Sequence, residues 1–143
     1  MTREEIIAFK NEARNYKFYH KQIYRISDKI DELQYQLNGV HGVSFEERAH
    51  TTNPEAKQDV FFRLLKKKDE LIIKKGEYQK KIASIENVIK VVEDYEKINA
   101  VLIRKVLLDG RDTRSVGDEI GFTHTAVVKR IDSALSKVKN ALS

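Results

Sequence analysis

Apolar residues recur at every third or fourth position over most of the chain, which is the pattern of amphipathic helices that bury one face. The spacing holds from residue 2 to residue 37 and predicts one long helix. Thr2, followed by Glu5 three residues later, is a capping-box pattern at its start, and Asn38-Gly39 marks its end. Its apolar stripe consists of Ile6, Phe9, Ala13, Tyr16, Tyr19, Ile23, Ile26, Ile30, Leu33 and Leu37.

The segment 39–53 has no apolar period and is predicted to be a loop. A second helix is expected to begin at Asn53-Pro54-Glu55, because Asn caps free N–H groups and Pro fits the first helical position. Its stripe, which is close to a heptad repeat, consists of Phe61, Leu64, Lys68, Leu71, Lys75, Tyr78, Ile82, Ile85, Ile89 and Val92. Neither long helix can bury its stripe alone, so residues 1–98 are predicted to form an antiparallel hairpin with a coiled-coil seam.

The last part of the chain, residues 99–143, contains three shorter helical patterns separated by Asp109-Gly110 and by Gly121. The first pattern covers residues 100–108. It is either capped by Asn99 or continuous with the long helix before it, since no glycine or proline forces a break there. Two helix arrangements therefore remain open at this junction.

The second and third patterns have the spacing of a helix-turn-helix, in which one helix crosses the DNA backbone and the next lies in the major groove. Thr113 begins the second helix, Gly117 permits close approach of a neighbour, and Gly121 supplies a left-handed turn. Thr123 then caps the third helix, in which Val127 faces the core. The predicted fold class is all-α: a long helical hairpin followed by a C-terminal three-helix helix-turn-helix domain.

The surface left over on the third helix has donors and methyl groups suited to phosphates and base edges. The candidate DNA-binding residues are Thr123, His124, Thr125, Val128, Lys129 and Arg130. From Thr123 onward, four basic residues stand against one acidic residue, a formal charge of 4 − 1 = +3. Five of these residues also have a plain alternative. Thr123 could be an N-cap alone, His124 an exposed polar residue, and Val128 part of the core if the helix is rotated by one position. Lys129 and Arg130 could be charges without a nucleic-acid contact.

Composition and charge exclude several further classes of protein. The chain has 27 basic and 22 acidic residues, so its formal charge is 27 − 22 = +5. The absence of cysteine excludes disulfides and thiolate metal sites and suits a reducing compartment. No apolar run is long enough for a membrane span, so a soluble, cytoplasmic protein is expected. We find no glycine-rich phosphate loop, and His41 and His50 lack a third metal ligand, so we expect no enzyme activity, cofactor or metal.

Residues 99–143 resemble region 4 of the sigma-70 type initiation factors, and the layout of the whole chain resembles small phage late-transcription regulators of the ArpU and RinA kind. The matching runs are Val-Gly-Asp-Glu-Ile-Gly-Phe-Thr at 116–123 and Thr-Ala-Val-Val-Lys-Arg-Ile-Asp-Ser-Ala-Leu at 125–135. In that resemblance Thr123 contacts phosphate and Arg130 lies beside the DNA backbone. The residues that it places against bases are His124, Thr125, Val128 and Lys129.

Three functions follow as hypotheses. The first is a sequence-specific double-stranded DNA-binding transcription regulator, encoded by a phage or prophage, whose hairpin supplies homodimerisation or a docking surface for a partner such as RNA polymerase. The second is a packaging factor similar to a phage terminase small subunit, which a ring of many protomers would indicate. The third is a sigma-like module that binds RNA polymerase without reading DNA. No membrane partner is expected.

Overall fold

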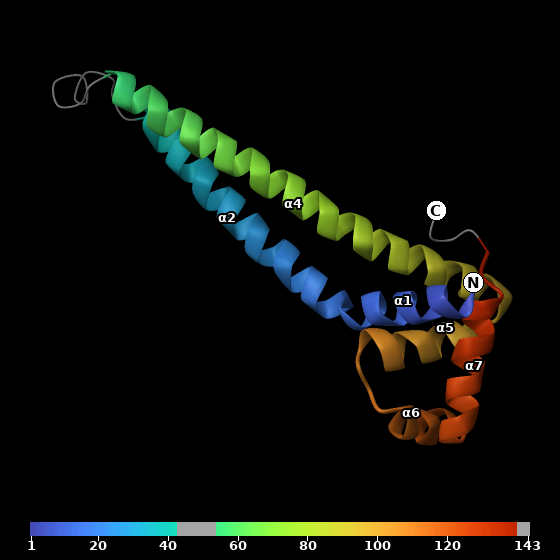
Figure 1. Ribbon diagram of the computed structural model, residues 1–143. Coiled ribbons are helices and arrows are strands. Elements are labelled where there is room, and N and C mark those ends of the chain that lie inside the picture. The colour runs from blue at the N-terminus through green and yellow to red at the C-terminus, as the bar shows by residue number, and fades with distance from the viewer. Residues whose placement is uncertain (43–53, 140–143) are drawn as a thin grey trace. The chain divides into compact units, whose positions relative to one another are not determined.

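The computed structural model describes residues 1–42 and 54–139, and every regular element in these ranges is a helix (Figure 1). The prediction of an all-α protein is confirmed. Residues 43–53 of the predicted loop, which include His50 and the Asn53 cap, lie outside the described residues. No described helix combines the length and the apolar character that a membrane crossing requires.

The chain divides into two compact units. Unit 1 comprises Met1–His20 and Lys80–Ser143, and unit 2 comprises Lys21–Gln79. This division differs from the predicted boundary at residue 98. The reason is that the N-terminal helix and the end of the second long helix pack with the C-terminal helices in one unit.

The first helical segment is interrupted, whereas its apolar period predicts one continuous helix. α1 (Arg3–Arg14) ends at Asn15, and α2 (Tyr16–Gly42) begins one residue later and continues past the predicted end at residues 38–39. Asn15 has φ −91° and ψ 5°, and its N–H donates to the Glu12 carbonyl at 3.0 Å, a tighter turn than the α-helix. The prediction of an unbroken helix is therefore wrong at this residue.

The start of α1 is the one expected from its sequence. The Glu5 N–H donates to Thr2 Oγ1 at 3.2 Å, and the Thr2 N–H donates to a Glu5 carboxylate oxygen at 3.4 Å. The capping box is thus confirmed, and two N–H groups that the first helical turn leaves unpaired both have acceptors.

The second long helix, α4 (Pro54–Tyr95), begins at the predicted proline and ends directly before Glu96. Glu96 has an extended backbone, with φ −156° and ψ 109°, and α5 (Lys97–Ile103) follows directly. Both alternatives for this junction are wrong: the helix does not run through, and Asn99 lies buried inside α5 instead of capping it.

Unit 2 contains the longer part of α2 and the first part of α4. Ile26, Leu33 and Leu37 of α2 are buried, as their spacing predicts. On α4, the residues of the predicted heptad-like seam between positions 61 and 78 are half-buried. Lys68, one of the two lysines in this seam, donates through Nζ to the side-chain oxygen of Gln34 on α2. A polar acceptor on α2 therefore accommodates a charged residue in the predicted seam.

In unit 1, α5 continues into one turn of π-helix, η1 (Arg104–Leu108), and is followed by α6 (Thr113–Ile120) and α7 (His124–Ser136). α1 contacts both η1 and α7, so the N-terminal helix belongs to the same packed unit (Figure 1). The core is formed by side chains from all these helices and from the end of α4. Its fully buried members include Phe9, Ile89, Leu102, Ile103, Val116, Val127 and Leu135.

Two polar contacts attach the N-terminal segment to α7. The Met1 amino group donates to the carbonyl oxygens of Ser136 at 3.1 Å and Val138 at 2.6 Å. A positive charge at a helix C-terminus complements the helix dipole and satisfies carbonyls that have no partner within the helix. Lys10 of α1 also forms an ion pair with Asp132 of α7. The apolar pattern of the sequence predicts neither the Met1 hydrogen bonds nor the Lys10–Asp132 ion pair.

A third polar cluster joins α2, α4 and η1 within unit 1. Arg104 makes two hydrogen bonds to the Glu86 carboxylate, at 3.1 and 2.6 Å, and the Tyr16 hydroxyl donates to Glu86 Oε1 at 2.6 Å. The hydrogen bond from Arg104 lowers the pKa of Glu86. Burial and the neighbouring carboxylate together raise the pKa of Tyr16 to about 12. The phenol therefore stays protonated and donating at neutral pH.

Candidate nucleic-acid interface

The turn between α6 and α7 is built on two glycines. Gly121 has φ 93°, in the left-handed region, and its N–H and that of Phe122 both donate to the Gly117 carbonyl, at 2.7 and 2.8 Å. This geometry ends α6 at the predicted glycine. A Cβ added at Gly117 would lie far inside contact distance of the Phe122 carbonyl oxygen and 3.4 Å from Val127 Cγ2. Close approach at Gly117 was predicted from a neighbouring helix, but the backbone that comes close is the Phe122 carbonyl of the turn itself, and α7 reaches Gly117 only through the Val127 side chain.

The third helix of the predicted motif, α7, begins as expected. The Ala126 N–H donates to Thr123 Oγ1 at 3.1 Å, so Thr123 is its N-cap. Val127 is fully buried, whereas Val128 is half-buried. This confirms that Val127 faces the core and excludes the alternative in which the helix is rotated by one position.

The candidate residues on α7 differ in what the structure leaves accessible. Thr123, Thr125 and Lys129 are exposed. His124 is also exposed, but its ring Nδ1 is hydrogen-bonded to Thr113 Oγ1 at the start of α6. The sequence reasoning assigned no role to Thr113 beyond beginning a helix. This bond connects the first residues of α6 and α7 and orients the imidazole.

Arg130 is held by the protein itself. Its Nη1 donates to Glu96 Oε1 at 3.2 Å and to Asn99 Oδ1 at 3.4 Å, and the guanidinium lies over the Phe122 ring at 4.4 Å from the centroid. Cation–π stacking and charge-assisted hydrogen bonds together fix this side chain. The sequence indicated a contact with the DNA backbone and missed Glu96, because a partner 34 residues away has no local signal.

Two acidic residues near this face have internal partners. Glu119 of α6 is paired with Lys105 and, at 2.6 Å, with Arg111, and these hydrogen bonds lower its pKa. Asp132 of α7 is paired with Lys10. Charge on these carboxylates is therefore matched inside the protein, and Lys129 adds its charge to the exposed face of α7.

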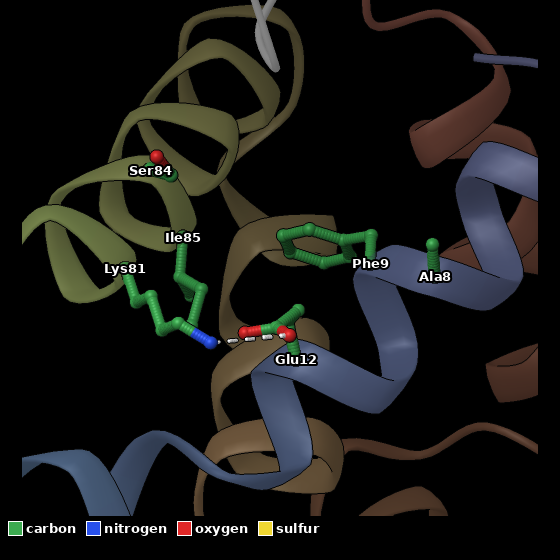
Figure 2. A pocket seen from close by; sticks show the side chains of 6 residues that line it. All are labelled: Ala8, Phe9, Glu12, Lys81, Ser84 and Ile85. Atoms are coloured by element: carbon green, nitrogen blue, oxygen red, sulfur yellow. Dashed lines mark ion pairs between the residues drawn. The ribbon is translucent and has the colours of Figure 1, made fainter. Parts of the chain in front are cut away.

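A hollow between α1 and α4 lies elsewhere in unit 1 (Figure 2). The side chains of Phe9 and Ile85 line it, and Lys81 forms an ion pair with Glu12 at 3.9 Å beside them. Its volume is about 220 Å³, less than the roughly 300 Å³ at which small-molecule sites begin. Its lining is mainly apolar, and its charged groups already pair with each other. This hollow does not have the features of a catalytic site.

Within residues 1–42 and 54–139, no three His, Asp or Glu side chains are grouped so that they could hold a metal ion. Comparison of the chain with models of protein families, with curated proteins and with solved structures gave no match. The assignment of the α6–α7 face therefore depends on its own geometry and charge.

Proposed function

We propose that the protein is a sequence-specific double-stranded DNA-binding transcription regulator and that α7 reads the major groove. One observation carries the proposal: the tight Gly117–Phe122 turn sets α7 after α6 while the first half of α7 keeps an exposed polar edge. We propose further that residues 99–143 act as a helix-turn-helix of the sigma region 4 kind and that α2 and α4 form a coiled-coil hairpin.

The chemistry of the exposed edge supports this proposal. α7 has 13 residues and is about 20 Å long. An α-helix with its side chains is about 10–12 Å in diameter, which fits the width of the major groove, about 12 Å. The first turn of α7 has unpaired N–H groups and the positive end of the dipole, which favour a phosphate. Thr125 and Lys129 are four residues apart and therefore lie on one side of the helix. Both present hydrogen-bond donors suited to phosphates or base edges.

Arg130 has a different role in this proposal. Because its guanidinium is bound to Glu96 and stacked on Phe122, we propose that it positions α7 and does not contact the duplex directly. His124, fixed by Thr113, remains a candidate contact to a base or a phosphate.

We expect the affinity for duplex DNA to fall steeply with salt, because bound lysines and arginines release the counterions condensed on DNA. Each phosphate contact contributes about −0.9 to the slope of log K against log salt concentration. Fluorescence anisotropy with a duplex selected from a random pool, measured at several salt concentrations, gives this slope. An affinity for the duplex that does not change with salt concentration would contradict the proposed interface.

The variant Lys129→Ala is expected to weaken binding to the selected duplex by about 1 kcal/mol, roughly fivefold in Kd, and to reduce the salt slope by about 1 if the lysine contacts a phosphate. Lys90→Ala is the matched control, because it removes the same charge from an exposed lysine on α4. Equal effects of the two variants would show that only net charge matters, and α7 would then not be the reading helix.

Two further measurements separate the alternative functions. A ring of many protomers in a mass measurement would favour the packaging factor. The absence of duplex binding at low salt, together with retained binding of RNA polymerase, would select the polymerase-interaction module.

A further inference from the structure

The exposed side of α4 in unit 2 has four residues at spacings of four, three and four: Phe62, Lys66, Asp69 and Ile73. At 100° per residue they lie on the opposite side of the helix from the half-buried stripe. Phe62 is 61% and Ile73 is 65% exposed, so both large apolar side chains present most of their surface to solvent on this face. We call these four residues the α4 stripe.

We propose that the α4 stripe is a self-association surface and that its partner is the same stripe of a second copy, running antiparallel. Reversing the direction places Phe62 against Ile73 of the second copy, and Lys66 against Asp69 of the second copy. A two-fold axis repeats each pair, so the interface has two apolar pairs at its ends and two opposite-charge pairs between them. The order apolar, basic, acidic, apolar is therefore complementary to itself.

The ionic groups of the stripe are available for this contact. Lys66 and Asp69 are both exposed. Neither of them has an ion pair within 4.0 Å among the described residues, whereas several other charged residues of the chain do. Opposite charges across an interface fix its register and direction, and like charges there oppose association.

A comparable stripe on α2 provides the contrast. Tyr24, Asp28, Asp31 and Tyr35 have the same spacing of four, three and four, and the two tyrosines are 76% and 80% exposed. An antiparallel pairing of this stripe with itself would place Asp28 against Asp31 of the second copy, with like charge at both central positions. Exposed apolar area is present on both helices, but only the α4 stripe has charges that allow it to pair with itself.

The extent of the stripe sets the expected strength. It covers about 16 Å of helix. About one turn beyond its two ends lie Asp59 and Glu77. The same pairing would bring them within one position of each other with like charge, so the contact ends there. Such an interface is smaller than the roughly 800 Å² per partner of a stable complex, and we expect a dissociation constant in the range of roughly 10–100 µM. This inference does not depend on the proposed DNA binding.

Sedimentation of the full chain over a wide concentration range tests the proposal. The wild-type protein is expected to form dimers, and Lys66→Glu or Asp69→Lys is expected to weaken dimerisation at least about fivefold, because each creates two like-charge pairs. The double variant Lys66→Glu/Asp69→Lys restores opposite charges and is expected to dimerise as the wild type does. A mixture of the two single variants is expected to form the mixed dimer in preference to either homodimer.

Tyr35→Ser is the matched control, because it removes an aromatic side chain that is even more exposed than Phe62 from α2 and is expected to leave dimerisation unchanged. Phe62→Ser is expected to weaken it. A wild-type protein that stays monomeric at the highest concentration would overturn the proposal, and so would a double variant that is as weak as the single variants. Failure of DNA binding would leave these results unaffected, because the sedimentation experiment contains no DNA.

Discussion

Replacing Gly117 with alanine is expected to lower the free energy of unfolding by about 2–3 kcal/mol, the range seen for overpacked sites. The added methyl group would collide with the Phe122 carbonyl oxygen, which is part of the backbone and cannot move aside as a flexible side chain can. Relief requires α7 to shift relative to α6. Urea unfolding followed by far-UV circular dichroism measures the change.

Gly76→Ala is the matched control for this variant. Gly76 lies inside α4, and an added Cβ there meets no atom within 4 Å. Alanine favours an unstrained helix over glycine by about 1 kcal/mol, so this change is expected to raise the free energy of unfolding. If Gly117→Ala were as well tolerated as Gly76→Ala, the close approach at the turn would be refuted, and the position of α7 would lose its explanation.

The second large effect is expected at the cluster of Glu86, Arg104 and Tyr16. Glu86→Gln should reduce the free energy of unfolding at pH 7 by about 1.5 kcal/mol, in the range for hydrogen bonds to charged groups. The expected loss lies at the lower end of that range because the Glu86 and Arg104 side chains are 33% and 44% exposed, and solvent screens their attraction.

The pH dependence of this effect follows from the lowered pKa of Glu86. A carboxylate whose pKa is depressed in the folded state stabilises the fold fully above its unfolded value, 4.5, and the contribution is lost as the pH falls through the folded value. The difference between wild type and Glu86→Gln should therefore be largest at pH 7 and should shrink below pH 4.5.

Glu32→Gln is a suitable control, because it neutralises an exposed carboxylate on α2 in unit 2. Urea midpoints measured for the three proteins at pH 7, 5, 4 and 3 separate the cluster from a general charge effect. A difference between wild type and Glu86→Gln that stays constant down to pH 3 would show that the cluster does not bind Glu86 in its ionised form.

Only part of the candidate site could be predicted from the sequence. The cap at Thr123 and the turn at Gly121 could be predicted, because each depends on hydrogen bonds between residues at most five positions apart. The role of Arg130 could not be predicted, since it depends on Glu96, and Glu96 reads as one more acidic residue at the end of a lysine-rich helix. The bond between Thr113 and His124 likewise exists only once α6 and α7 are in place.

By itself, the sequence determined the helical class, the helix starts at Thr2, Pro54 and Thr123, and the inward face of α7, because helix period and capping are local properties of the chain. Only the tertiary structure decided where the long helices break, at Asn15 and Glu96. It also decided that α1 packs with the C-terminal helices. These features result from contacts between distant segments, whose packing and ion pairs override a helical period that the sequence continues through both breaks.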